Sequence, residues 1–145
     1  MNTIYYIEIK TDRFDQKSEL PVHYNAGNRF YGKDVAEFIK DRLNLNTFKI
    51  IDEDWGWLVY GVIDGIQIKY CIGDWHDIDK RFGGIKEGDP TTVANWRIFI
   101  KTAKTIRFFG FIPVNRSVNC PIHLGEQLVE LLKSVNIIVT DNGIE

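Results

Sequence analysis

Several side chains that could do chemistry are concentrated between residues 52 and 79, in the stretch DEDWGWLVYGVIDGIQIKYCIGDWHDID. Its last part supplies Asp74, His76, Asp77 and Asp79, whose oxygen and imidazole atoms are of the types that bind metal ions. Their spacing matches neither an EF-hand calcium loop nor a zinc motif. We therefore expect a solvated acidic loop here, without a bound metal ion or another cofactor.

A β-hairpin is expected to position these residues. Asp64-Gly65 separates two runs of β-forming residues, and this dipeptide favours a type I′ turn because both central residues need positive φ. Such a turn fixes the pairing of the two strands, with Val59 facing Tyr70. One face then carries eight apolar residues that we expect in the core: Trp55, Trp57, Val59, Ile63, Ile66, Ile68, Tyr70 and Ile72.

The opposite face of the hairpin contains a spot without side chains, where Gly56 would face Gly73. Glycine in a strand often marks the close approach of a ligand or of another backbone. A twist, a bulge or a neighbouring side chain that fills the depression would explain the same two glycines. The candidate binding residues around this spot are Asp54, Gly56, Leu58, Cys71, Gly73, Trp75, His76 and Asp77.

Further along the same register, acidic residues would face one another. Asp52 would lie opposite Asp77, and Glu53 would lie opposite His76. Like charges that are directly opposed in a ladder are unfavourable. We expect that the ladder ends before these residues, that an Arg or Lys neutralises them, or that a cation binds.

The other residues give no catalytic assignment. The chain has no GxSxG, P-loop, GxGxxG or HExxH motif. Its two cysteines, Cys71 and Cys120, form no CxxC pattern and are expected to be free thiols in a reducing compartment. No signal peptide and no apolar run of membrane length is visible, so we expect a cytoplasmic protein without membrane contact.

Around the hairpin, the spacing of apolar residues predicts two helices and several strands. Residues 33–44 and 123–135 each carry an apolar stripe at helical spacing. Residues 3–10, 96–102 and 136–140 alternate as strands do. This order favours an α+β fold, in which a mostly antiparallel sheet carries both helices on one face as a two-layer sandwich.

Three segments are less clearly defined. Residues 11–32 are long for a loop, and a short edge strand could lie near residues 19–24. Residues 105–114 are apolar on both phases and fit a strand, a helical turn or a packed loop. Asp34 and Glu37 resemble a capping box at the start of the first helix.

The composition is that of one globular domain covering residues 1–145. The hydrophobic share is 44% and the charged share is 26%, which argues against disorder. The net charge is −2, so there is no overall basic excess to neutralise phosphates. We therefore expect no nucleic-acid partner, although Lys101, Lys104 and Arg107 lie close together.

The pattern resembles a set of small bacterial proteins of uncharacterised function. The matching stretches are RFYGKDVAEFIKDRL, DEDWGW and WRIFIKT, followed by an amphipathic helix and a final strand. The resemblance covers most of the chain from Arg29 onward, and EDWGW is its most distinctive element. It implies the fold and a bacterial origin, and it transfers no catalytic residue.

Two classes of function follow from these observations. We favour a non-enzymatic module that binds a protein with a basic surface, which includes the toxin-neutralising immunity type. The alternative is a small-molecule- or metal-binding enzyme with its site at the open end of the hairpin. A homodimer through Phe99, Tyr60 or the IRFFGF segment at residues 106–111 is compatible with the first class. The acidic rim that suggests the basic partner consists of Asp52, Glu53, Asp54, Asp74, Asp77 and Asp79.

Overall fold

A computed structural model describes residues 2–74 and 94–145 of the chain. The strands, in chain order, are β1 (Tyr5–Thr11), β2 (Lys49–Glu53), β3 (Gly56–Ile63), β4 (Ile66–Asp74), β5 (Ala94–Phe108), β6 (Ile112–Val118) and β7 (Ile138–Ile144). The described helices are η1 (Tyr24–Gly27), α1 (Lys33–Arg42) and α3 (Ile122–Ser134), of which η1 is a short 3-10 segment.

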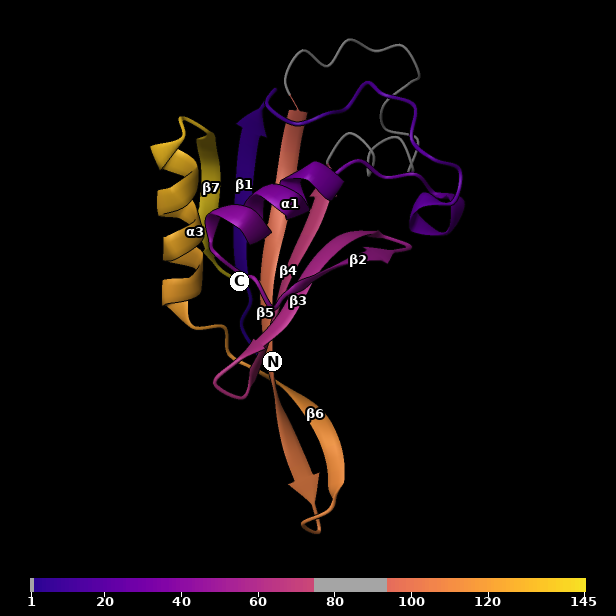
Figure 1. The fold of residues 1–145 in the computed structure, drawn as a ribbon. Coiled ribbons are helices and arrows are strands. Elements are labelled where there is room, and N and C mark those ends of the chain that lie inside the picture. Colours follow the sequence, from indigo (N-terminus) through magenta and orange to yellow (C-terminus); the bar gives the residue numbers. More distant parts are fainter. Residues whose placement is uncertain (1, 75–93) are drawn as a thin grey trace.

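In the described residues, the strands form one antiparallel sheet in the order β2-β3-β4-β5-β1-β7, and β6 pairs with β5 outside that path. α1 packs against β2, β3 and β4, while α3 packs against β1 and β7 (Figure 1). The α+β class that the sequence predicts, with an antiparallel sheet and helices packed against it, is confirmed.

The core lies between the helices and one face of the sheet. Buried residues of α1 and α3 belong to one apolar cluster with alternate residues of the central strands. In β1 these residues are Tyr5, Ile7 and Ile9, which point to the same face because side chains alternate along a strand. The completely buried Trp96 is part of the same cluster.

An asparagine follows each of the two long helices, two residues after the last helical residue. Asn44 and Asn136 adopt positive φ values of 55° and 64°, a conformation that asparagine tolerates better than most residues. After each of them, a backbone N–H bonds back to a helical carbonyl: Leu45 to Lys40 at 2.9 Å, and Ile137 to Leu132 at 3.0 Å. These bonds satisfy carbonyl groups that a helix end leaves without a partner, so the asparagines define where the helices stop.

The predicted hairpin register is confirmed from the turn as far as Trp57, which pairs with Ile72. Beyond that point the prediction is wrong, because β3 begins at Gly56. Asp54 and Trp55 form a turn that connects β3 to the preceding strand, β2. Gly56 therefore pairs with Glu53 and not with Gly73. Asp52 faces Trp57 across β2 and β3, and the β3–β4 ladder ends before Asp52, which is the first of the three expected outcomes. Asp77 lies outside the described residues.

Further sequence expectations need correction. Trp55 lies in the turn and is 40% exposed, and Ile63 beside the hairpin turn is 43% exposed, so neither belongs to the core. No strand forms near residues 19–24, where the described chain has turns and η1. α1 has Gly32 as its N-cap, and the carboxylate of Asp34 binds backbone groups instead of forming a capping box.

Candidate functional site

The DEDWGW motif is a docking place for the protein's own first loop. The buried Asn25 donates its backbone N–H to the carboxylate of Asp52 at 2.7 Å. Its side-chain amide donates to the carbonyl oxygens of Glu53 and Gly56, each at 2.7 Å. Its amide oxygen accepts from the backbone N–H of Phe30 at 2.8 Å. One asparagine thus satisfies backbone groups on both sides of the β2–β3 turn.

Two further hydrogen bonds tie the same loop to the motif. The indole of the buried Trp57 donates to the carbonyl oxygen of Phe30 at 2.9 Å. The side-chain amide of Asn28 donates to the carbonyl oxygen of Asp54 at 2.7 Å. In the described residues, the polar groups of DEDWGW therefore hold the fold together, and the motif is mainly architecture.

The space beside Gly56 is filled by the neighbouring strand. A Cβ atom at Gly56 would lie 2.6 Å from the carbonyl oxygen of Ile72, and its φ of +157° is one that other residues rarely adopt. The predicted close approach at this glycine is therefore the approach of another backbone. Gly73 is not paired with Gly56, and in β4 it lies opposite Arg97 of β5.

The other candidate residues lie in different settings. Leu58 and Cys71 face each other across β3 and β4, as the predicted register requires. Both side chains are buried. Asp54 lies in the β2–β3 turn. Trp75, His76 and Asp77 lie outside the described residues. In the part of the chain that the structure describes, no group of three or more His, Cys, Asp or Glu side chains could hold a metal ion.

Both thiols are shielded from solvent. Cys71 and Cys120 are free and buried, and burial raises the pKa of each thiol above its usual value because it disfavours the charged thiolate. A thiol that stays protonated is a poor nucleophile. Neither cysteine therefore has the setting of a catalytic residue.

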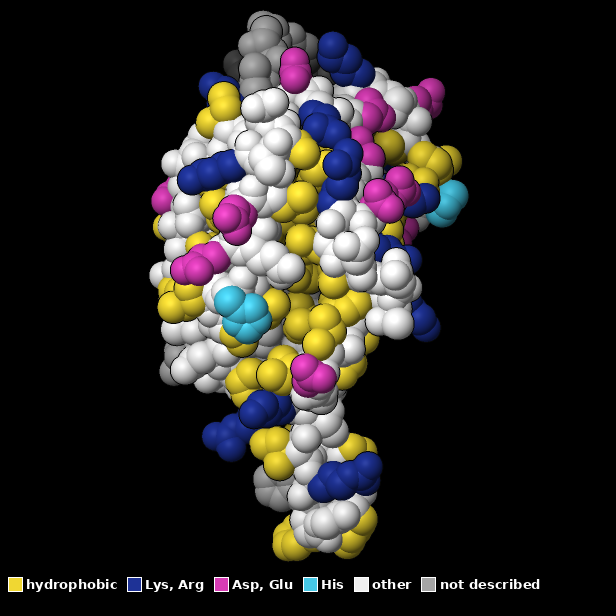
Figure 2. Space-filling view, turned by 60° about the vertical axis from the view of Figure 1, so that its left-hand side comes forward, with side chains coloured by type: hydrophobic (Ala, Val, Ile, Leu, Met, Phe, Trp, Pro, Cys, Tyr) yellow, Lys and Arg dark blue, Asp and Glu magenta, His cyan; other side chains and the backbone are white. Residues whose placement is uncertain are grey.

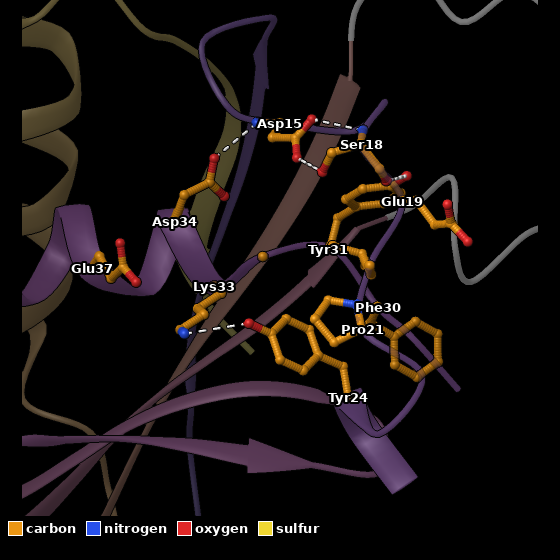
Figure 3. A pocket seen from close by; sticks show the side chains of 12 residues that line it. Asp15, Ser18, Glu19, Pro21, Tyr24, Phe30, Tyr31, Lys33, Asp34 and Glu37 are labelled. Atoms are coloured by element: carbon orange, nitrogen blue, oxygen red, sulfur yellow. Dashed lines mark hydrogen bonds between the residues drawn. The ribbon is translucent and has the colours of Figure 1, made fainter. Parts of the chain in front are cut away.

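A pocket of about 260 Å³ lies between the first loop and the N-terminal turn of α1 (Figure 3). Four carboxylates line it: Asp34 and Glu37 from α1, and Asp15 and Glu19 from the loop. Its apolar and aromatic lining residues are Leu20, Pro21, Tyr24, Phe30 and Tyr31. We call this site the first-loop pocket.

Internal hydrogen bonds fix the walls of the first-loop pocket. The half-buried Asp34 accepts from the backbone N–H groups of Asp15 at 2.8 Å and of Val35 at 3.0 Å. Desolvation by burial raises the pKa of Asp34 above its ordinary value. Lys33 lies over the ring of Tyr24, with Nζ 5.5 Å from the ring centroid and 3.4 Å from the hydroxyl oxygen. The pocket thus has a surplus of negative charge beside aromatic walls.

The most prominent surface feature is a ribbon that leaves the body of the molecule. The pairing of β4 with β5 ends at Lys104, and beyond it β5 continues with β6 as its sole described partner. Figure 1 shows this ribbon projecting away from both long helices. We call residues 104–116 the arm.

The arm has one apolar face and one polar face. Ile106 and Val114 pair on the face that continues the core side of the sheet, and they are 37% and 38% exposed. At the arm's end, Phe109 and Phe111 are 84% and 70% exposed. The opposite face is braced at its base, where the amide of Gln67 donates to Thr105 at 3.1 Å and to Asn115 at 2.9 Å. The arm therefore presents apolar surface on a braced support.

The arm is also basic. Lys104, Arg107 and Arg116 lie within it, and it contains no Asp or Glu. The chain has 18 Lys and Arg against 20 Asp and Glu, so removing the arm's three leaves 15 against 20, a net charge of −5. Figure 2 shows dark-blue and yellow side chains together along the arm. Positive charge and exposed apolar surface thus coincide.

Part of this arrangement can be predicted from the sequence. The stretch IRFFGF was identified as a candidate apolar patch, and its aromatic residues Phe109 and Phe111 are exposed. The other two candidates, Phe99 and Tyr60, lie on the sheet face away from the core and are half-buried. The first-loop pocket was missed, because its residues come from a loop without a recognisable motif.

Comparisons with known proteins give no family for this chain. In the described residues, no helix has both the length and the apolar character needed to span a membrane. No family model, no curated protein and no solved structure matches the chain.

Proposed function

We propose that the protein is a non-enzymatic binding module that contacts another protein through its arm. The observation that carries this proposal is the exposure of Phe109 and Phe111 at the end of the arm. Burying one such side chain contributes about 1.5–3 kcal/mol, and large exposed apolar groups in a cluster are typical of interaction sites. A braced ribbon also loses little conformational freedom on binding, which favours affinity.

The charge of the arm suits a partner with an acidic contact surface. Arg107 lies near the aromatic end of the arm, Lys104 and Arg116 pair across its base, and the arm contains no acidic residue. Such charge complementarity speeds encounter and selects partners. The sequence favoured a basic partner for an acidic rim. Asp52 of that rim is engaged with Asn25, so the arm supports the proposal better than the rim does.

The immunity type of binding, a bacterial origin and a cytoplasmic location stay predictions, as does the resemblance to small bacterial proteins with an EDWGW motif. The enzyme alternative has less support than the binding module. Its site would need room beside Gly56, where the carbonyl oxygen of Ile72 lies.

The test compares an arm variant with a matched surface variant. Phe109→Ser with Phe111→Ser removes the apolar end of the arm, whereas Val22→Ser with Ile138→Ser removes two apolar residues, 76% and 63% exposed, from other surfaces. Immobilised wild-type protein and both variants are incubated with host extract, and retained proteins are quantified by mass spectrometry. We expect a partner that the wild type and the control variant retain and the arm variant loses. Equal retention by all three proteins would contradict the proposal.

A further inference from the structure

The arm and the first-loop pocket have opposite chemistry. The arm is basic and ends in exposed phenylalanines, whereas the pocket combines carboxylates with aromatic walls. Among the ion pairs of the described residues, none involves Glu19 or Glu37 at the pocket, and both residues are exposed. The pocket can therefore accept positive charge from outside.

We propose that the arm of one copy of this chain docks at the first-loop pocket of a second copy, and that the second copy does the same in return. This inference rests on the proposed function and names the partner as the protein itself. Complementary charge attracts the two surfaces, and the apolar end of the arm packs against Pro21, Tyr24 and Phe30.

The position of the two surfaces fits a reciprocal contact. The arm projects at the bottom of the view in Figure 1, whereas η1 and α1, which border the pocket, lie well above it on the body of the molecule. Two copies placed side by side in opposite directions bring each arm to the partner's pocket. Such an arrangement has two-fold symmetry and closes with two equivalent contacts, as common homodimers do.

Direct pairing of two arms is a weaker arrangement for this chain. β6 is an edge strand in the arm, but Pro113 lies within it and cannot donate a ladder hydrogen bond. Two arms would also place Arg107 and Arg116 against like charges. The arm's charge thus disfavours a second arm and favours the remainder of a second copy, which carries the negative charge.

The size of the pocket agrees with a side-chain occupant. Its volume of about 260 Å³ is below the roughly 300–1,000 Å³ of typical small-ligand sites. It has room for one aromatic or guanidinium group. The aromatic walls offer a face for either group, because rings attract both other rings and cations.

Charge reversal tests this contact without touching the core. The arm variant carries Arg107→Glu and Arg116→Glu, and the pocket variant carries Glu19→Lys and Glu37→Lys, all at exposed positions. Sedimentation velocity is run on each protein over a concentration series at low and at high salt. We expect the wild type to dimerise, and each variant alone to associate at least about tenfold more weakly because like charges then meet.

Mixing the two variants supplies the decisive measurement. The reversed arm of one then meets the reversed pocket of the other, and the second contact keeps its native charges, so a heterodimer is expected to form. A wild type that stays monomeric at all concentrations would overturn the inference, as would an association that the pocket variant does not weaken or that mixing does not restore. If the wild type is monomeric but retains another protein through its arm, the proposed function stands and the inference about a second copy fails.

Discussion

The side-chain amide of Asn25 donates a hydrogen bond to the carbonyl oxygen of Gly56 at 2.7 Å, across 31 residues of chain. The same amide reaches Glu53, so the loop and the β2–β3 turn are held by one side chain. A buried polar group that loses its partner costs the free energy of its desolvation. The attachment of the first loop to the β2–β3 turn therefore depends on Asn25.

Replacing Asn25 with alanine should destabilise the protein strongly. It leaves the carbonyl oxygens of Glu53 and Gly56 and the N–H of Phe30 without that partner. We expect the free energy of unfolding in urea to fall by about 2–4 kcal/mol. Asn28→Ala is the matched control, since it removes one exposed bond and should cost less than about 1 kcal/mol. Equal losses for the two variants would contradict this role of Asn25.

Gly56 should not tolerate a side chain. Gly56→Ala combines an unfavourable positive φ with a contact to the carbonyl oxygen of Ile72, so we expect a loss of about 2 kcal/mol or more in urea unfolding. Gly65→Ala is the control, because its φ is +78° but a Cβ there would have no heavy atom within 4 Å. The control should lose about 1 kcal/mol from the backbone conformation alone. If Gly56→Ala lost no more stability than Gly65→Ala, the contact with the carbonyl oxygen of Ile72 would not be what excludes a side chain.

The two tryptophans of DEDWGW should differ in their effect on stability. Trp57 is 3% exposed and its indole is hydrogen-bonded to Phe30, so Trp57→Ala should cost about 3–5 kcal/mol. Trp55 is 40% exposed, and Trp55→Ala should cost about 1 kcal/mol or less. Thermal and urea unfolding of both variants measure the difference. A larger loss of stability for Trp55→Ala than for Trp57→Ala would contradict this difference in burial.

The free energy of unfolding should fall at alkaline pH because of the buried phenol of Tyr70. Burial raises the pKa of Tyr70 to about 12 from an ordinary value of 10.0, so the native state holds the phenolic proton over a pH range in which the unfolded chain releases it. The contribution of this group to stability is complete below pH 10 and is lost as the pH rises toward 12. Its loss has a maximum slope of about 1.4 kcal/mol per pH unit.

The comparison with Tyr70→Phe isolates that contribution. The variant keeps the buried ring and lacks the titrating group, so its stability relative to the wild type should improve between pH 10 and 12. Urea unfolding of both proteins at pH 9, 10 and 11 gives the difference. A stability difference that does not change with pH would mean that Tyr70 ionises in the native state as easily as in the unfolded chain.

The accuracy of the sequence predictions depends on how local each signal is. Asp64-Gly65 predicts the β3–β4 pairing correctly, because a two-residue turn restricts the register by itself. Alternation alone predicts Trp55 in the core, since it cannot reveal that Trp55 itself lies in the turn between β2 and β3. Asn25 could not be identified, because its side-chain partners Glu53 and Gly56 lie far along the sequence.

The exposure of the arm could not be predicted from local sequence either. Residues 105–114 are apolar on both phases, which does not distinguish a buried segment from one that leaves the body. The outcome depends on where β4 begins, since its first residue, Ile66, pairs with Lys104 and β4 reaches no further along β5. The sequence thus identified the apolar stretch, whereas its exposure follows from the lengths of neighbouring strands.

The central position of β1 has a consequence for synthesis of the chain. β1 lies between β5 and β7, and Tyr5 pairs with both Ile100 and Ile144. A ribosome releases β1 first, yet neither neighbouring strand exists until most of the chain has been translated. Contacts between such distant residues slow folding. β1 therefore stays without a neighbouring strand until β5 has been translated, and its pairing with β7 completes the sheet last.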